Sequence, residues 1–143
     1  MNTSDNKTIS AIQQDLIDNF NLFDDWLGKY EFLIDLGKTL PPYSDEDKQE
    51  QYKVQGCQSN VWIRHCYNNN KITFTATSDS AIVCGLIYLL LTIFNDHTPE
   101  QIINAKPIFI ERIGLDRHLS MTRKNGLYAM LQAIKHIASG YID

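Results

Sequence analysis

Three cysteines, Cys57, Cys66 and Cys84, carry the most nucleophilic side chains of this 143-residue sequence. Their number is odd and their spacing is wide, whereas a disulfide framework favours an even count in a short secreted chain. No Cys-x-x-Cys pair is present, so the sequence indicates neither a zinc ribbon nor a thioredoxin-type redox pair. We therefore expect reduced thiols and a cytoplasmic protein.

Cys57 lies in a segment whose composition is typical of a surface turn. The segment reads Val54-Gln55-Gly56-Cys57-Gln58-Ser59-Asn60 and separates two strand-like stretches. Glycine, small residues and amides favour turns, and on an exposed turn a thiol can reach into a partner's pocket. An ordinary thiol pKa of about 8.5 leaves little thiolate at neutral pH, so a neighbouring cation, hydrogen-bond donors or the partner's pocket must activate it. The residues alone leave two interpretations equally open: a reactive thiol and a small turn residue.

The other two cysteines fit a structural role better. Cys66 lies near the end of an expected strand, and Cys84 lies in an apolar stretch beside Val83 and Leu86. Free cysteine commonly behaves as a small buried hydrophobe. His65 precedes Cys66, but neighbours on a strand face opposite sides of the sheet, so a shared metal ion is geometrically unfavourable.

The composition is that of an ordinary globular domain. Hydrophobic residues make up 43% and charged residues 21% of the chain, and the length suits a single domain, residues 1–143, with a flexible terminus over 1–8. A net charge of −4 without any run of Lys or Arg argues against nucleic acid and against an anionic membrane surface. The longest apolar run, residues 81–94, is shorter than the roughly 20 residues that span a bilayer, so it predicts a buried helix. Residues 1–10 lack the apolar core of a signal peptide.

Apolar periodicity predicts helices at both ends of the chain. A first stripe repeats every three to four residues: Ile9, Ile12, Leu16 and Phe20. A second helix is expected to start at Asp24 or Asp25 and to stop before Pro41, followed by a solvated connection over residues 44–51. In the last third, residues 78–80 can cap the helix 81–94, and Thr98-Pro99 starts another with a capping box. The last helix is expected from about residue 122 to 138, with one apolar face: Leu127, Leu131, Ile134 and Ala138.

The middle third changes to a period of two. Residues 61–67 and 71–77 are rich in β-branched and aromatic side chains, and the asparagines 68–70 between them predict a hairpin. Ile72, Phe74 and Ala76 fall on one face of the second strand, and residues 52–54 add a short third strand. We therefore predict an α+β fold: a single domain with a small antiparallel sheet of about three strands packed against helices from both ends of the chain.

Several short motifs stand in a fixed order along the sequence. They are residues 56–62 (GCQSNVW), 30–41 (YEFLIDLGKTLP), 78–83 (SDSAIV) with Gly85-Leu86, Thr98-Pro99, Gly114-Leu115, His118-Leu119 and Arg123-x-Asn125-Gly126-Leu127. In order and spacing the chain resembles the SufE family, the sulfur acceptors of cysteine desulfurases, over roughly residues 20–137. The resemblance implies a fold like that of SufE and IscU proteins. The sequence departs from the family pattern at Ser80, where alanine is frequent in the family. It also has two additional thiols, Cys66 and Cys84, and these leave open whether the protein is sensitive to oxidation.

The resemblance also implies a function for Cys57. In the family, the cysteine at this motif position takes persulfide sulfur from the desulfurase, and the protein stimulates the desulfurase and delivers sulfur to iron–sulfur cluster assembly. The chain would be a covalent sulfur-transfer partner rather than an independent enzyme, and it would need no cofactor because pyridoxal phosphate belongs to the desulfurase. The implied partners are a SufS-like cysteine desulfurase and a SufB-containing scaffold complex. Further residues are implied to position the loop or to contact the partner: Gly56, Gln58, Ser59, Asp79 and Arg123.

Arg123 also has an argument from its position. A cation in the first turn of a helix opposes the helix dipole, so its charge needs an acceptor elsewhere. Arg123 lies four residues before Leu127, on the inward edge of its helix, and two roles stay open: docking onto the desulfurase, and holding the Cys57 turn. Asp79 has a local explanation as an acid at the start of the helix 81–94, and His118 fits a structural role.

Two other functions stay open. An IscU-like scaffold for iron–sulfur clusters or zinc needs three or four convergent soft ligands. Cys57 fits one such position, but Asp79 and Ser80 occupy the place where a second cysteine would be wanted. A purely allosteric activator of the desulfurase would not need Cys57 at all.

Overall fold

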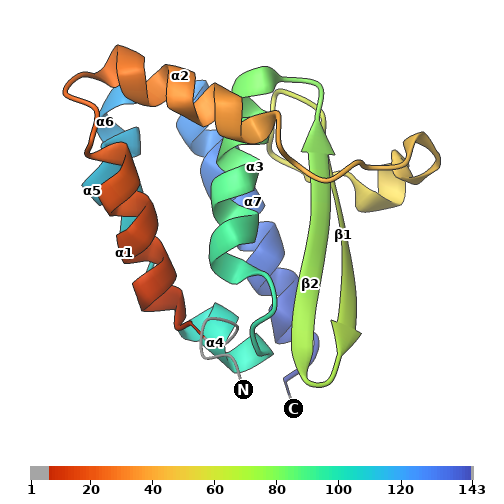
Figure 1. The fold of residues 1–143 in the computed structure, drawn as a ribbon. Helices are drawn as coiled ribbons and strands as arrows, with labels where there is room; N and C mark the ends of the chain where they lie inside the picture. Colours follow the sequence, from red (N-terminus) through yellow and green to blue (C-terminus); the bar gives the residue numbers. More distant parts are fainter. Residues whose placement is uncertain (1–6, 143) are drawn as a thin grey trace.

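Helices from both ends of the chain pack against one β-hairpin in the computed structural model, which describes residues 7–142 (Figure 1). Before the hairpin come α1 (Ile9–Phe20), α2 (Trp26–Gly37) and two 3₁₀ turns, η2 (Asp45–Asp47) and η3 (Glu50–Tyr52). The hairpin consists of β1 (Val61–Asn68) and β2 (Lys71–Ser78). After it come α3 (Ala81–Phe94), α4 (Pro99–Asn104), α5 (Phe109–Ile113), α6 (Leu115–His118) and α7 (Met121–Ser139).

Two asparagines make the hairpin turn. Asn69 and Asn70 both have positive φ angles, 53° and 63°, and the flanking Asn68 and Lys71 are the last pair of the antiparallel register. A two-residue turn with both central residues in the left-handed region matches the twist of the two strands, and asparagine tolerates that region. The register therefore runs without a slip from this turn to the pair of Val61 and Ser78.

Side-chain caps start the long helices. Thr8, Asp25, Ser80 and Ser120 each accept a hydrogen bond from a backbone N–H in the first turn of α1, α2, α3 and α7 respectively. Asp25 is one of the two predicted start points of α2, which ends at Gly37, before Pro41. Of the expected flexible terminus, residues 1–6 lie outside the described residues.

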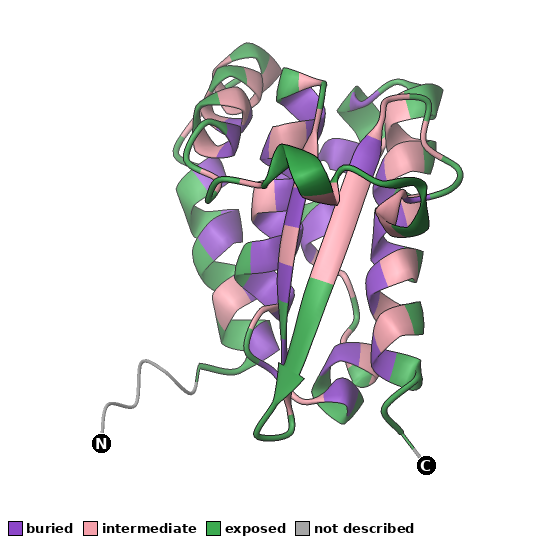
Figure 2. Ribbon diagram, turned by 90° about the vertical axis from the view of Figure 1, so that its right-hand side faces the viewer, coloured by how far each residue is buried: buried purple, intermediate pink, exposed green. Residues whose placement is uncertain are grey.

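The helix α3 is the centre of the hydrophobic core. Ten of its residues are buried: Ile82, Val83, Gly85, Leu86, Ile87, Leu89, Leu90, Leu91, Ile93 and Phe94. α2 packs against α3 at a contact between Gly37 and Gly85. The two backbones are so close there that a Cβ atom on Gly37 would lie 2.5 Å from the Gly85 nitrogen. The predicted apolar face of α7 is buried on the same core, whereas the half of β1 next to the hairpin turn is exposed (Figure 2).

The α+β class, with helices from both ends packed on a small antiparallel sheet, is confirmed. The third strand predicted over residues 52–54 is wrong, because the sheet has two strands and Tyr52 ends the turn η3. Of residues 52–54, only Lys53 forms a bridge, an isolated one to Trp62. Gly56 then adopts a positive φ that turns the chain away before a ladder can extend. Within residues 7–142, no helix is both long and apolar enough to cross a membrane.

Candidate functional site

The Cys57 loop, residues 55–60, bulges from the base of the hairpin toward α3 and α7. A backbone hydrogen bond from the Val54 N–H to the Val61 carbonyl (2.9 Å) closes it. Gly56 has a φ of 91° and lies so close to α7 that a Cβ atom there would be 3.3 Å from the Cβ of Ala129. A side chain at position 56 would be strained by its backbone and crowded by the helix, so glycine allows the loop to lie flat on α7.

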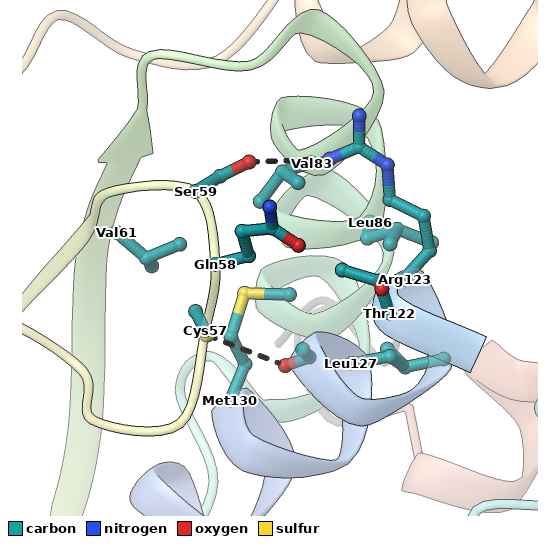
Figure 3. A pocket seen from close by; sticks show the side chains of 11 residues that line it. Cys57, Gln58, Ser59, Val61, Val83, Leu86, Thr122, Arg123, Leu127 and Met130 are labelled. Atoms are coloured by element: carbon teal, nitrogen blue, oxygen red, sulfur yellow. Dashed lines mark hydrogen bonds between the residues drawn. The ribbon is translucent and has the colours of Figure 1, made fainter. Parts of the chain in front are cut away.

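Cys57 is half-buried against α7. Its thiol donates a hydrogen bond to the Gly126 carbonyl oxygen, with an Sγ–O distance of 3.6 Å. The side chain lines a shallow hollow, the Cys57 hollow (Figure 3). The wall of the hollow is apolar, formed by Val61, Val83, Leu86, Leu127 and Met130, and its rim is polar, with Gln58, Ser59, Thr122 and Arg123.

Burial raises the pKa of the Cys57 thiol above its ordinary value. The expectation of an exposed turn thiol is wrong for this conformation, because Cys57 is half-buried. The loop does form a turn, but it folds inward, since α7 offers an apolar surface and a carbonyl acceptor. Any activation by a cation or by donors has to come with a change of the loop or from a partner.

Arg123 ties the loop to the start of α3. Its Nη1 donates to the Ser59 hydroxyl and to the Ser80 hydroxyl, each at 3.2 Å. Ser80 is also the residue that caps α3, so one guanidinium joins the loop, α3 and α7. These two hydroxyl groups are the acceptors that the helix-dipole argument requires for the Arg123 charge.

Asp79 holds the other end of the loop. Its two carboxylate oxygens accept hydrogen bonds from the Asn60 backbone N–H (3.2 Å) and from the Asn60 side-chain amide (2.8 Å). Asp79 itself does not cap α3, because Ser80 does. Asp79 thus contacts the loop, and its place directly before the cap of α3 also agrees with the explanation as an acid at a helix start.

The structure brings the predicted site residues together around one loop. Gly56, Gln58 and Ser59 belong to the loop, and Arg123 and Asp79 contact it from two helix starts. Sequence reasoning missed Asn60 and Ser80 as partners of these side chains. The sequence did contain a signal for both residues. An arginine on the inward edge of its helix requires acceptors nearby, and a carboxylate beside a loop requires donors.

The remaining thiols differ from their expected positions. Cys66 is exposed, so the expectation of a buried cysteine there is wrong. Cys66 lies in the exposed half of β1, next to the hairpin turn. Cys84 is half-buried and donates to the Ser78 carbonyl at 3.4 Å. A hydrogen-bonded, partly buried thiol is compatible with its structural interpretation.

Metal-ligand geometry is not found around Cys57. In the part of the chain that the structure describes, no group of three or more His, Cys, Asp or Glu side chains converges. His65, next to Cys66, instead contacts the Tyr141 hydroxyl at 2.7 Å. The scaffold alternative thus has one soft ligand at the site.

Fold and site together define a small α+β protein that holds one loop cysteine between a hairpin and two helix starts. The profile of the SufE family, described as the Fe-S metabolism associated domain, matches residues 14–138. A hypothetical protein from Thermus thermophilus, whose structure was solved in solution, has the same fold with a TM-score of 0.73 at 18% identity, over 90% of this chain and 94% of that chain. The chain therefore belongs to the SufE family, as its motifs predicted, and is associated with iron–sulfur metabolism.

Proposed function

We propose that this protein accepts sulfur on Cys57 from the persulfide of a cysteine desulfurase and carries it to iron–sulfur cluster assembly. The observation that supports this most directly is the position of Cys57: the family-matched cysteine lies in a loop that is closed on itself at Val54 and Val61. Such a loop can change position without breaking the strand ladder. The thiol is held by one long hydrogen bond to Gly126, which a partner's pocket can replace.

The transfer is a thiol–disulfide type of displacement. The Cys57 thiol loses its proton, and the thiolate attacks the terminal sulfur of the desulfurase persulfide. A new S–S bond forms on Cys57 while the S–S bond of the desulfurase breaks, and the desulfurase cysteine leaves as a thiolate. No net oxidation occurs. Removal of the sulfur frees the desulfurase cysteine for another turnover, which accounts for stimulation of that enzyme.

The proposed partners follow from this step. A SufS-like desulfurase supplies the sulfur and holds the pyridoxal phosphate, so this chain needs no cofactor of its own. A SufB-containing scaffold complex receives the sulfur in the cytoplasm. Arg123 and Asp79 hold the loop in its inward position between the two encounters, and Gly56 permits its fold.

The test is the mass of Cys57 after incubation of the protein with the desulfurase and free cysteine. The wild-type protein is expected to gain one sulfur atom on the peptide that contains Cys57. Cys57→Ser should keep its fold, because the side chain is only half-buried, and should neither gain sulfur nor stimulate the desulfurase. Cys66→Ser, which changes an exposed thiol, is the matched control and should behave as wild type. Sulfur on the Cys57→Ser protein, or full stimulation by it, would contradict the proposal and favour the allosteric activator.

A further inference from the structure

Ser80 takes part in two structures at once, the start of α3 and the contact that holds the Cys57 loop. Its side-chain oxygen accepts a hydrogen bond from the Val83 N–H (3.4 Å), which caps α3. The same oxygen accepts a hydrogen bond from the Arg123 Nη1 (3.2 Å). A hydroxyl oxygen has two lone pairs, so it can serve both donors together. The Ser80 hydroxyl therefore connects the start of α3 to a side chain of α7.

The backbone of Ser80 is held on both sides. Its N–H donates to the Ser78 hydroxyl oxygen (3.2 Å), and its carbonyl accepts from the Cys84 N–H (3.0 Å). β2 ends at Ser78, and α3 begins at Ala81. Ser80 thus lies between two regular elements that belong to the core, and it forms a fixed point beside the loop.

Arg123 reaches the loop through the Ser59 hydroxyl, to which its Nη1 also donates at 3.2 Å (Figure 3). An arginine side chain has many rotamers, so a contact with Ser59 alone would allow the guanidinium to follow the loop as it leaves α7. The hydrogen bond to Ser80 keeps the guanidinium beside α3 instead. Movement of the loop then has to break one of the two hydrogen bonds of Nη1.

The charge of Arg123 has no carboxylate partner here. The guanidinium lies in the first turn of α7 and within hydrogen-bond distance of the cap of α3, so the positive ends of two helix dipoles face it. Among residues 7–142, Arg123 forms no ion pair. Two neutral hydroxyl groups therefore carry the contact, and the loop can leave without the separation of opposite charges.

We propose that Ser80 is a positioning residue for Cys57: its hydroxyl anchors Arg123, and through Arg123 it sets how often the Cys57 loop leaves α7. Alanine, which is frequent at this position in the family, would lack the acceptor, so this chain has an additional restraint on its thiol. The inference rests on the proposed function for the reaction of Cys57 with a desulfurase, but the restraint is a property of the free protein.

The alkylation rate of Cys57 by iodoacetamide in the free protein measures the opening of the loop. Ser80→Ala removes the acceptor and should raise this rate by about two- to fivefold. The substitution also removes a helix cap, so Thr98→Ala, which removes the side-chain cap of α4 instead, is the matched control and should keep the wild-type rate. An unchanged rate in Ser80→Ala, or an equal increase in both variants, would overturn the proposal.

Ser80→Asp tests the opposite direction. Aspartate is also a good helix cap, and its carboxylate offers Arg123 a stronger, charge-assisted acceptor at the same place. The alkylation rate of Cys57 should therefore fall below that of the wild type by at least about twofold. If Ser80 acted through the helix cap alone, Ser80→Asp would react at the wild-type rate, which would contradict the positioning role.

The same two substitutions in an Arg123→Ala background separate the anchor from other effects. Because Ser80 acts through Arg123, neither Ser80→Ala nor Ser80→Asp should change the alkylation rate further in this background. A slower reaction of Ser80→Asp that persists without Arg123 would show a direct effect of the new charge on the thiol. A faster reaction of Ser80→Ala that persists would show a loss of local structure. Either result would overturn the proposal.

Sulfur transfer is measured separately, as the gain of sulfur on Cys57 of the wild type with the desulfurase and free cysteine. If the wild type gains no sulfur, the proposed function fails, and the alkylation rates still decide the role of Ser80. If the wild type gains sulfur and the alkylation rates of the Ser80 variants equal that of the wild type, the positioning role alone fails.

Discussion

At the scale of single residues, Cys57 combines the nucleophilic role that we propose for it with an environment that favours its neutral form. Only a protonated thiol can donate to the Gly126 carbonyl, and the surrounding apolar wall disfavours a thiolate. The inward position of the loop therefore suppresses the reactivity of the thiol. The reactivity of the thiol has to increase when the loop leaves α7, so the proposed function implies that loop position and sulfur acceptance are coupled.

The first prediction concerns the pH at which Cys57 reacts. Because burial raises the pKa of its thiol, the midpoint of its iodoacetamide reaction against pH should lie above that of the same thiol in the unfolded chain. Burial of the neutral thiol stabilises the fold fully below the ordinary thiol pKa, and this contribution is lost as the pH rises through the higher pKa of the folded state. Peptide mapping by mass spectrometry follows both cysteines in one sample.

Urea supplies the control for this measurement. In the unfolded chain both thiols are exposed, so their two midpoints should coincide near the ordinary value. If Cys57 of the folded protein reacted at a lower pH than it does in urea, burial would not be the dominant influence on its pKa, and a nearby cation would have to be.

The position of Cys57 in a turn-like loop could be predicted from the sequence, but its burial could not. Cys57 stands in a motif that composition marks as a turn, and that local signal was sufficient. Its burial depends on Gly126 and Met130, about seventy residues further along the chain, which no local pattern connects to it. The burial of Cys66 was wrongly expected for a related reason, because contacts to Trp62 and Arg64 from residues 47–52 do not reach the exposed half of β1.

At the scale of elements, the loop is held by two polar contacts to helix starts. Arg123 contacts Ser59 and Ser80, and Asp79 contacts Asn60. All of these side chains are partly or largely exposed, so each contact is expected to contribute modestly. Their joint effect is to keep the loop on α7 in the absence of a partner.

Arg123→Ala should therefore free the loop and raise the alkylation rate of Cys57 in the protein alone. A contact worth about 1 kcal/mol changes the population of an open loop by about fivefold, which sets the expected increase in rate. Lys124→Ala removes a neighbouring cation that forms no ion pair or side-chain hydrogen bond among residues 7–142, and it serves as the control. A wild-type alkylation rate in Arg123→Ala, together with a weaker, salt-sensitive affinity for the desulfurase, would assign Arg123 to docking instead.

The contact of α2 with α3 carries a separate prediction about stability. A Cβ atom on Gly85 would overlap the backbone of Leu33 in α2, so Gly85→Ala should push the two helices apart. Overpacking of this kind costs about 1–3 kcal/mol in the free energy of unfolding, measured by urea denaturation. Gly140→Ala, where the nearest heavy atom lies at an ordinary 3.4 Å, should change the stability by less than about 0.5 kcal/mol. Equal stability of the two variants would show that α2 can move away from α3 without a loss in the free energy of unfolding.

Elements with a strong local signal were predictable from the sequence. The helix 81–94 and the hairpin have the bounds that periodicity and turn residues indicate, within one residue. The strand at 52–54 failed because a run of three residues cannot show a period, and the chain turns at Gly56. α5 and α6 went unpredicted for the same reason, since four or five residues give too little of a helical repeat.

At the scale of the whole molecule, the fold brings together segments from distant parts of the chain. The Cys57 loop precedes the hairpin, α3 follows it, and α7 closes the sequence, yet the starts of α3 and α7 meet at the loop. α1 and α2 cover the other sides of α3. This arrangement supplies one thiol, an apolar wall and polar contacts, which suits a carrier of sulfur more than a scaffold that binds a cluster.

The difference between carrier and scaffold gives the last prediction, which concerns metal content. A scaffold site needs three or four soft ligands that converge, and among residues 7–142 no three His, Cys, Asp or Glu side chains do so. Near Cys57, the carboxylate of Asp79 is already engaged by Asn60. Protein purified under reducing conditions, incubated with excess zinc and then desalted, should retain well under one zinc or iron per chain by elemental mass spectrometry. One tightly held equivalent in the wild type, lost in Cys57→Ser and kept in Cys66→Ser, would overturn the carrier function in favour of the scaffold.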